Sequence, residues 1–490
     1  MKKKFISNLI LVLLLNVVIK PFYILGIDAE ILKITEQSSP GSYGTYFSLL
    51  SLTFIFNILL DMGVNTFNTR NIAQNSQLIQ KHFSGIFTLK LFLGFVYLLI
   101  ILSIGFLFSY ELKEMKWLLV IGLNQVLIAL ILFFRSNLSA LLLFRQDSLL
   151  SVIDRLLLIF FCGYFLWANV THQIITIDFF ILSQTLAYGA TAILGFILVV
   201  RKTKKFSLKW DYAFFLMIIK KSLPYALLIF LMSIYYYSDV VMIEQMKGSL
   251  EATSYAHGYR FFMAFNMLGF LFAGLLLPIF SKMIKERINI NSITWLSFKL
   301  IFFIAVLIGG GFWFIKEDII HWRYQLSGED LIHSSNTFGW LLLSFIAVSC
   351  NYIFGTLLTA NGRLKPMNIL AITGVFINVI LNIFLINQSG STGAAIASLI
   401  TQVFTLIAQV ILCYKFFPLK IKVLPIFQII GYPFIFFIGI FLLDLFFLSK
   451  EVYTWPLKLM IYTSIGIASG FSFGFVRMKD VLSIIKISKN

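Results

Sequence analysis

Long apolar runs are the feature of this sequence that most restricts its fold. Fourteen of them follow one another through the 490 residues, and each is long enough to cross a bilayer as an α-helix, which takes about 20 apolar residues. Apolar residues make up 59% of the chain and charged residues 12%, which is about half the charged share of soluble domains. We therefore expect an all-α polytopic membrane protein. The expected spans are residues 5–27, 43–62, 83–109, 117–137, 149–168, 176–200, 222–244, 254–280, 293–315, 334–360, 367–386, 393–414, 424–446 and 455–476.

The cysteines and histidines predict neither a disulfide framework nor a metal site. Cys162, Cys350 and Cys413 all lie in apolar runs and have no paired spacing. The five histidines are scattered, and no two of them have the spacing of a zinc-binding helix. We expect no bound cofactor.

Basic residues are distributed unevenly between the connections. An even number of spans places both termini on one side of the membrane, where the connections carry 27 Lys and Arg residues against 10 on the other side. Because basic loops stay in the cytoplasm, both termini are predicted to be cytoplasmic. Most of the net charge of +18 thus comes from basic residues spread over the cytoplasmic connections, where they set the orientation of the protein in the membrane. Because these residues do not form a basic patch, we expect no nucleic-acid partner. Arg135, Asp154 and Arg155, at inner helix ends, are interpreted as topology determinants.

The start of the chain resembles a signal peptide, because three lysines precede an apolar run. No small-residue cleavage site follows the run, and Lys20-Pro21 interrupts it. We expect a retained first helix.

A weak internal repeat predicts two lobes. Ser42-Tyr43-Gly44 opens the second span and Ser254-Tyr255-Ala256 opens the eighth, 212 residues later. Many transporters are built from such repeats, with the substrate site between them. The basic, aromatic connection between the halves is typical of an amphipathic segment on the membrane surface. We expect an N-terminal lobe at 1–200, a cytoplasmic amphipathic linker at 201–221, a C-terminal lobe at 222–415 and accessory helices at 424–476.

Three stretches resemble the multidrug/oligosaccharidyl-lipid/polysaccharide exporter superfamily, and within it the Wzx-type polysaccharide flippases. The first is Pro40-Gly41-Ser42-Tyr43-Gly44-Thr45-Tyr46 with Asp61-Met62-Gly63 and Arg70. The second is Ser222-Leu223-Pro224 with Asp239, Tyr255, Tyr259-Arg260 and Pro278. The third is Asn361-Gly362-Arg363 with Asn378, Leu381-Asn382, Gly390 and Gly393-Ala394-Ala395-Ile396-Ala397. The resemblance implies a MATE-like fold, in which two six-helix lobes enclose a cavity that opens alternately to either side of the membrane.

The substrate that this resemblance implies is an oligosaccharide on polyprenyl pyrophosphate. Its hydrated, anionic head needs a wet cavity with cations, and Arg and Lys are the side chains that hold phosphate. Ionised residues inside apolar runs are candidates for such a cavity. The expected substrate-binding residues are Lys20, Lys90, Arg260 and Tyr236, the last for stacking on sugars. The expected ion-coupling or gate residues are Asp239, Asp61 and Arg70, with protons or Na⁺ as the coupling ion.

These assignments have structural alternatives. Lys20 either meets pyrophosphate where the first helix bends at Pro21 or extends to the outer headgroups, and Lys90 either lines the cavity or extends to the inner ones. Asp239 and Arg260 either couple ions and bind substrate or form a buried pair. Arg70 either closes a cytoplasmic gate with Asp61 or only sets topology.

The sequence therefore predicts a flippase and not an enzyme. It would move a lipid-linked oligosaccharide, for O-antigen, capsule or another surface polymer, from the inner to the outer leaflet of a bacterial plasma membrane. No Walker A pattern indicates ATP use. We expect a monomer in the bilayer, with polysaccharide polymerase machinery as a further contact. The alternatives are a lipid II flippase or cation-coupled drug exporter of the same superfamily, or a membrane polysaccharide polymerase or ligase.

Overall fold

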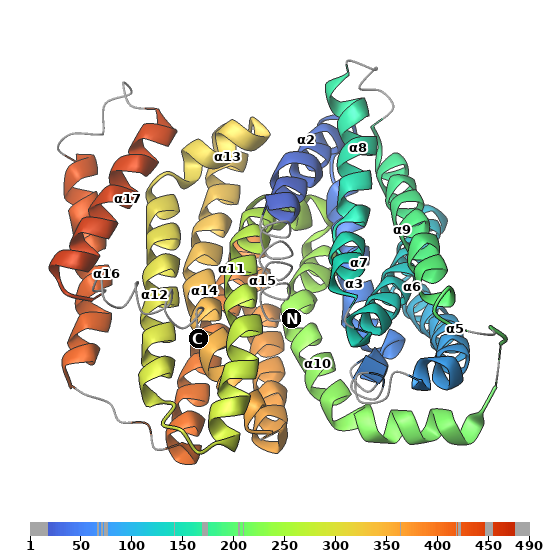
Figure 1. Ribbon diagram of the computed structural model, residues 1–490. Helices are drawn as coiled ribbons and strands as arrows, with labels where there is room; N and C mark the ends of the chain where they lie inside the picture. The colour runs from blue at the N-terminus through green and yellow to red at the C-terminus, as the bar shows by residue number, and fades with distance from the viewer. Residues whose placement is uncertain are drawn as a thin grey trace. The chain divides into compact units, whose positions relative to one another are not determined.

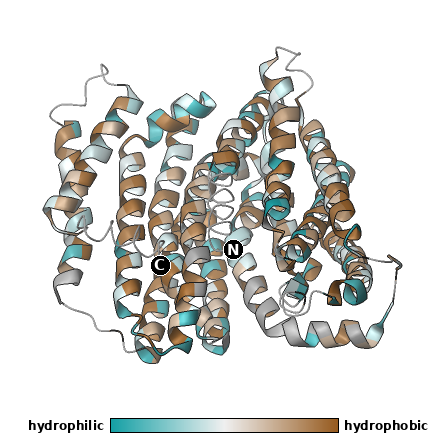
Figure 2. Ribbon diagram, in the orientation of Figure 1, coloured by the Kyte–Doolittle hydropathy of each residue, from teal (hydrophilic) through white to brown (hydrophobic). Residues whose placement is uncertain are grey.

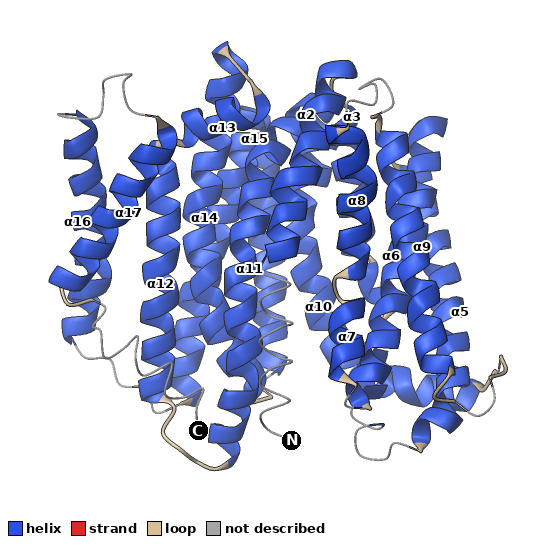
Figure 3. Ribbon diagram, turned by 45° about the horizontal axis from the view of Figure 1, so that its top comes forward, coloured by secondary structure: helices blue, strands red, loops and turns tan. Residues whose placement is uncertain are grey.

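The computed structural model describes residues 18–65, 68–69, 72, 77–141, 143–168, 175–203, 206–208, 210–362, 364–417, 419, 423–445 and 454–475. Every regular element in these ranges is a helix (Figure 3). The chain forms two compact units, Met1–Ala256 (unit 1) and His257–Asn490 (unit 2). The helices, labelled in Figure 1, are η1 (Tyr23–Asp28), α2 (Ala29–Ser38), α3 (Ser42–Ile55), η2 (Asn57–Leu60), α5 (Leu78–Leu107), α6 (Leu112–Ala140), α7 (Phe144–Leu150), α8 (Ile153–Trp167), α9 (Ile177–Val200), α10 (Tyr212–Lys247), α11 (Ser249–Lys285), α12 (Asn291–Phe314), α13 (Lys316–Tyr324), α14 (Gly328–Ala360), α15 (Leu364–Phe416), α16 (Val423–Leu443) and α17 (Trp455–Ser472).

Apolar helices long enough to cross a membrane confirm the predicted all-α membrane fold. Within the described ranges seven stretches meet this criterion, and Figure 2 shows hydrophobic residues along most of their length. The total of fourteen spans stays a prediction. The seven stretches are Leu78–Leu107, Leu112–Ala140, Arg145–Trp167, Ile177–Val200, Asn291–Phe314, Gly328–Ala360 and Lys365–Phe416.

Short polar signals determine where several helices begin. At the start of α6, Glu111 and Glu114 form a capping box, in which the Glu111 N–H donates to Glu114 Oε2 at 2.8 Å. At the start of α9, Thr176 Oγ1 accepts a bond from the Phe179 N–H at 3.2 Å. Between α10 and α11 a single residue, Gly248, makes the turn with φ of 90°, a conformation that glycine adopts without strain. Helix α5 packs against α6, and α8 packs against α9.

Helix α3 lies at the centre of unit 1. Eleven of its fourteen residues are buried, and it packs against α2, α6, α9 and α10. Helix α10 is strongly bent, as Figure 1 shows, and its C-terminal part lies along α3 through the ring contact of Tyr237 with Phe54 at 4.9 Å. A polar group on α3 therefore faces protein and not lipid.

Unit 2 is built on α14 and α15. The 53-residue α15 is two helices joined at Ser389 and Gly390, where the backbone leaves helical geometry between the two spans expected there. Helices α16 and α17 pack on α12 through glycines: Gly310 contacts Phe436, and Gly470 contacts Phe303. Small residues allow this close approach, because attraction between membrane helices depends on packing.

Candidate functional site

The first described helix is irregular where it enters the core of unit 1. Two residues after Pro21 the chain forms the π-helix η1, which Tyr23 begins and Asp28 ends. Both side chains are buried, and Tyr43 of α3 donates a hydrogen bond to Asp28 Oδ1 at 2.7 Å. Short π-helical segments occur often at functional sites, which makes this stretch a candidate.

Arg155 lies against the same segment. It stands in the first turn of α8, just after the break at Ser151–Val152 that separates α8 from α7. Its Nη1 donates to the Tyr188 hydroxyl at 2.8 Å, and its guanidinium carbon is 4.7 Å from the centre of the Tyr23 ring. Discontinuous membrane helices of this kind bind anionic substrates in transporters. We call Lys20, Tyr23, Asp28, Arg155 and Tyr188 the basic–aromatic cluster.

Basic and acidic side chains meet at this cluster. Arg155 Nε is 3.7 Å from Asp154 Oδ2, and Arg135 pairs with Asp147 at 2.8 Å. Lys20 lies within electrostatic range of both arginines and adds a further positive charge. A planar guanidinium stacked on tyrosine, beside an ammonium, can bind a phosphate or pyrophosphate group, while the tyrosine rings offer faces to a sugar.

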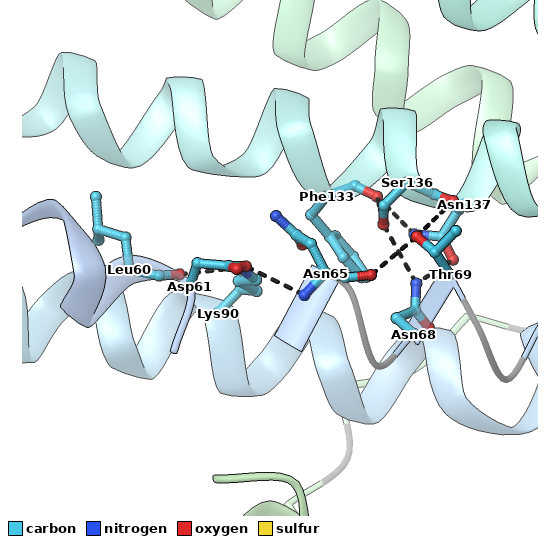
Figure 4. A network of polar contacts seen from close by, with 9 residues as sticks. All are labelled: Leu60, Asp61, Asn65, Asn68, Thr69, Lys90, Phe133, Ser136 and Asn137. Atoms are coloured by element: carbon cyan, nitrogen blue, oxygen red, sulfur yellow. Dashed lines mark hydrogen bonds and ion pairs between the residues drawn. The ribbon is translucent and has the colours of Figure 1, made fainter. Parts of the chain in front are cut away.

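A second polar cluster, shown in Figure 4, surrounds Lys90 of α5. Lys90 is 2% exposed, forms an ion pair with Asp61 and donates to the main-chain oxygen of Leu60 at 2.9 Å. The helix begun by α3 breaks here, and Met62 and Gly63 have φ of 44° and 78°. Lys90 thus does not extend to headgroups: it supplies a donor to a carbonyl at the helix break. Its predicted contact with substrate stays a prediction.

The network of Figure 4 continues toward the end of α6. Asn65 N donates to Asp61 Oδ1 at 3.2 Å, and Asn68 Nδ2 donates to Asn137 Oδ1 at 3.0 Å. The predicted gate partner of Asp61, Arg70, lies outside the described residues. The Asp61–Arg70 gate therefore stays a prediction, and the structure shows Lys90 as a partner of Asp61.

The remaining predicted residues lie on α10 and α11. Asp239 is buried and accepts a hydrogen bond from the Tyr255 hydroxyl at 3.2 Å, and half-buried Tyr236 stacks on Tyr235 at 4.5 Å. Arg260 is 2% exposed, with Nη1 3.6 Å from Met263 Sδ. Asp239 belongs to unit 1 and Arg260 to unit 2, so their pairing stays a prediction.

The sequence pattern does not identify the centre of the basic–aromatic cluster. Arg155 has the position of a topology determinant, and no motif singles out Asp28 or Tyr188. One signal was available: Asp28 comes directly after an apolar run, a place where an ionised side chain is costly unless it has a partner. In the part of the chain that the structure describes, no group of three or more His, Cys, Asp or Glu residues could hold a metal ion.

Comparisons with known proteins agree with this architecture. The model of the family described as "Polysaccharide biosynthesis protein" matches residues 39–284. The lipid II flippase MurJ, in an inward closed conformation, has a TM-score of 0.70 at 17% identity, with 94% of this chain and 97% of that chain covered. An inward-facing MATE multidrug transporter of the MOP superfamily has a TM-score of 0.61 at 13% identity, covering 79% and 92%. A MOP superfamily transporter from Pyrococcus furiosus has 0.59 at 14%, covering 84% and 95%. No curated protein sequence matches. Because the sequence identities are 13–17%, these three matches show that the chain has the same fold as the three transporters.

Proposed function

Because the chain belongs to the polysaccharide biosynthesis protein family, we propose that it is a flippase for a polyprenyl-pyrophosphate-linked oligosaccharide. The substrate moves from the inner to the outer leaflet of the plasma membrane by alternating access between two six-helix lobes. Both termini lie in the cytoplasm, and the segment 201–221 joins the lobes on that side. The MurJ-like and MATE-like fold supports transport as the activity.

One observation carries the proposal: the basic–aromatic cluster is placed inside a bundle of apolar helices. A bundle that needed only to be stable would not bring Arg155 and Lys20 together among apolar helices, because ionised side chains there are costly and usually functional. Arg155 holds the pyrophosphate with its planar fork, and Lys20 adds a point charge. Arg260, Tyr236 and, once separated from Asp61, Lys90 are further proposed contacts with the headgroup.

Coupling to a proton or Na⁺ gradient is part of the proposal. A coupling carboxylate must be buried and must exchange its partner during transport. Asp239, whose described bond is to the neutral Tyr255 hydroxyl, meets the first condition, and Asp28 with Tyr43 meets it as well. Replacing each aspartate by asparagine while the proton or Na⁺ gradient is collapsed separately identifies which carboxylate and which ion are used.

The test is leaflet-specific accessibility of the lipid-linked oligosaccharide in cells that lack the protein. Complementation uses the wild type, Arg155→Gln, Arg260→Ala and the matched control Arg201→Gln, which removes an exposed arginine. We expect inner-leaflet accumulation that the wild type and the control relieve and the other two variants do not. Relief by Arg155→Gln removes the cluster from the mechanism.

The same experiment separates the alternative functions. Normal leaflet distribution without the protein rejects the oligosaccharide flippase. Accumulation of lipid II instead points to a lipid II flippase, and a changed drug tolerance points to a drug exporter of the same superfamily. Intact flipping with lost control of polymer length points to a polymerase or ligase.

A further inference from the structure

Two tryptophan rings meet at the end of unit 2 that the charge distribution predicts to be external. Trp322 of α13 and Trp455, the first residue of α17, have ring centres 4.9 Å apart, and their planes are inclined by 51°. One turn away on each helix, Lys458 Nζ lies 3.7 Å from Asp318 Oδ2. The two helices thus meet through a ring pair and an ion pair that lie next to each other. We call Asp318, Trp322, Trp455 and Lys458 the tryptophan platform.

Helix α13 is held in place by the face that lies opposite the platform. Figure 1 shows α13 running obliquely to α12 at one end of unit 2. Ile320 is fully buried, and Tyr324 donates a hydrogen bond to the main-chain oxygen of His257 at 3.1 Å. Asp318 and Trp322 are four residues apart and therefore share the other face of the helix. That face lies outside the core, because Trp322 is 55% exposed and the Asp318 side chain is 45% exposed.

The orientation of α17 is fixed in a similar way. One turn beyond Lys458, the buried Tyr462 donates a hydrogen bond to Asp444 Oδ1 at 2.7 Å, and its ring lies 6.0 Å from that of Phe314 on α12. Both helices therefore hold the platform side chains in position before a ligand arrives. A site arranged in advance loses less entropy on binding than a flexible one.

The surroundings of Trp322 differ from those of a tryptophan that only anchors a protein at the membrane surface. Trp167 and Trp210 are the other two tryptophans that are more than half exposed, and each contacts a phenylalanine, at 6.2 Å and 5.1 Å between ring centres. Trp322 instead contacts a second indole and has a paired carboxylate one turn before it. If the Trp322 ring lay in lipid, this carboxylate would lie close to lipid as well, which is costly.

From this arrangement we propose that the tryptophan platform is an external binding site for an oligosaccharide. The C–H face of a sugar ring packs on an aromatic face, while its hydroxyl groups donate to a carboxylate and accept from an ammonium group. Trp322 and Trp455 supply the rings, and Asp318 and Lys458 supply the charged groups. The ligand of this class is the headgroup delivered to the outer leaflet, an identification that rests on the proposed function. Binding there holds the delivered headgroup outside and opposes its return.

The experiment measures binding by fluorine NMR of the full-length protein in lipid nanodiscs, with fluorotryptophan in place of tryptophan. The probe is the oligosaccharide released by mild acid from the polyprenyl-linked pool of the cells, without its lipid. Trp322→Phe and Trp455→Phe assign the two platform signals. We expect both signals to shift saturably as the probe is added. The signal of Trp210, which is predicted to lie on the cytoplasmic side, should stay in place.

Variants of the platform test the roles of the rings and of the carboxylate. Trp322→Ala and Asp318→Asn, read from the Trp455 signal, should each weaken binding by about tenfold, as expected for a residue that anchors a ligand. The matched controls are Trp210→Ala and Glu317→Gln, which remove an exposed tryptophan elsewhere and an exposed carboxylate next to Asp318. Both controls should bind the probe as the wild type does. Asp318→Asn keeps both rings, so it remains a test if Trp322→Ala does not fold.

Platform signals that do not move at the highest probe concentration would mean that the rings are surface anchors only, which overturns the proposal. An equal loss of binding in Glu317→Gln and Asp318→Asn overturns it as well. Flipping is assayed separately in cells. Absent binding with normal flipping rejects the platform alone, whereas binding to the platform without flipping rejects the flippase and keeps the platform.

Discussion

The ion pair between Lys90 and Asp61 permits a quantitative prediction, because its two partners differ in burial. The Lys90 side chain is 1% exposed and that of Asp61 is 32% exposed. Two opposite charges about 3 Å apart attract each other by about 5 kcal/mol at an effective dielectric constant of about 20. Removing one partner of a buried pair costs about 3–5 kcal/mol, mostly because the other charge stays buried and unpaired.

The two single substitutions should therefore differ in cost. Asp61→Asn leaves a buried ammonium beside a carbonyl and a neutral amide, and we expect a loss of about 3 kcal/mol in the free energy of unfolding. Lys90→Met leaves a carboxylate that reaches solvent and keeps the Asn65 N–H, so we expect about 1.5 kcal/mol. The double variant should be no less stable than Lys90→Met alone, which corresponds to a coupling energy of about 3 kcal/mol.

The assay is reversible unfolding in mixed micelles, followed by tryptophan fluorescence, for the wild type and the three variants. The control is the Lys282–Glu286 pair, whose side chains are 74% and 47% exposed and whose cycle should give about 1 kcal/mol or less. Equal costs for Asp61→Asn and Lys90→Met, or additive costs in the double variant, would refute the reasoning. That result would mean that Lys90 is solvated in the protein.

Two further predictions follow from particular contacts. Arg155→Lys keeps the charge but loses the planar fork, and we expect flipping to fall by about tenfold, with no loss in Arg201→Lys. A Cβ at Gly393 would overlap the main chain of Leu385, so Gly393→Ala should cost about 1–3 kcal/mol of unfolding free energy, whereas Gly374→Ala, whose nearest neighbour is Thr405 Oγ1 at 3.8 Å, should cost little.

Much of the fold could be predicted from the sequence, because a bilayer imposes a length and a polarity on every span. The break between the spans expected at 367–386 and 393–414 is an example: the backbone leaves helical geometry at Ser389 and Gly390. The family resemblance, based on stretches such as Gly41-Ser42-Tyr43-Gly44, is confirmed by the family match and by the MurJ-like and MATE-like fold. The positions of the spans can be predicted because the hydropathy of a segment depends only on its own amino acids.

The pairing of charges could not be predicted in the same way. Lys90 and Asp61 are 29 residues apart, and Arg155 lies 132 residues from Tyr23. Which of them meet depends on the rotation of each helix about its axis, and irregular segments change that rotation. The π-helix η1 adds a residue to its turn and moves the side chains after it to another face, so a count of helical positions from Lys20 does not predict where Asp28 points.

Three charged side chains of unit 1, those of Asp28, Lys90 and Arg155, lie at or against a helix irregularity, whereas buried Asp239 lies within α10. Asp28 ends the π-helix, Lys90 bonds the carbonyl of Leu60 where the helix of α3 breaks, and Arg155 follows the break between α7 and α8. A break within a membrane leaves backbone groups without partners, and these must be bonded by protein because lipid offers none. Lys90 meets this need by donating to the Leu60 carbonyl. Asp28 and Arg155 connect their irregular segments to neighbouring helices through the Tyr43 and Tyr188 hydroxyls. In unit 1 these three charged residues and the points at which the helices can bend therefore coincide, as the proposed alternating access requires.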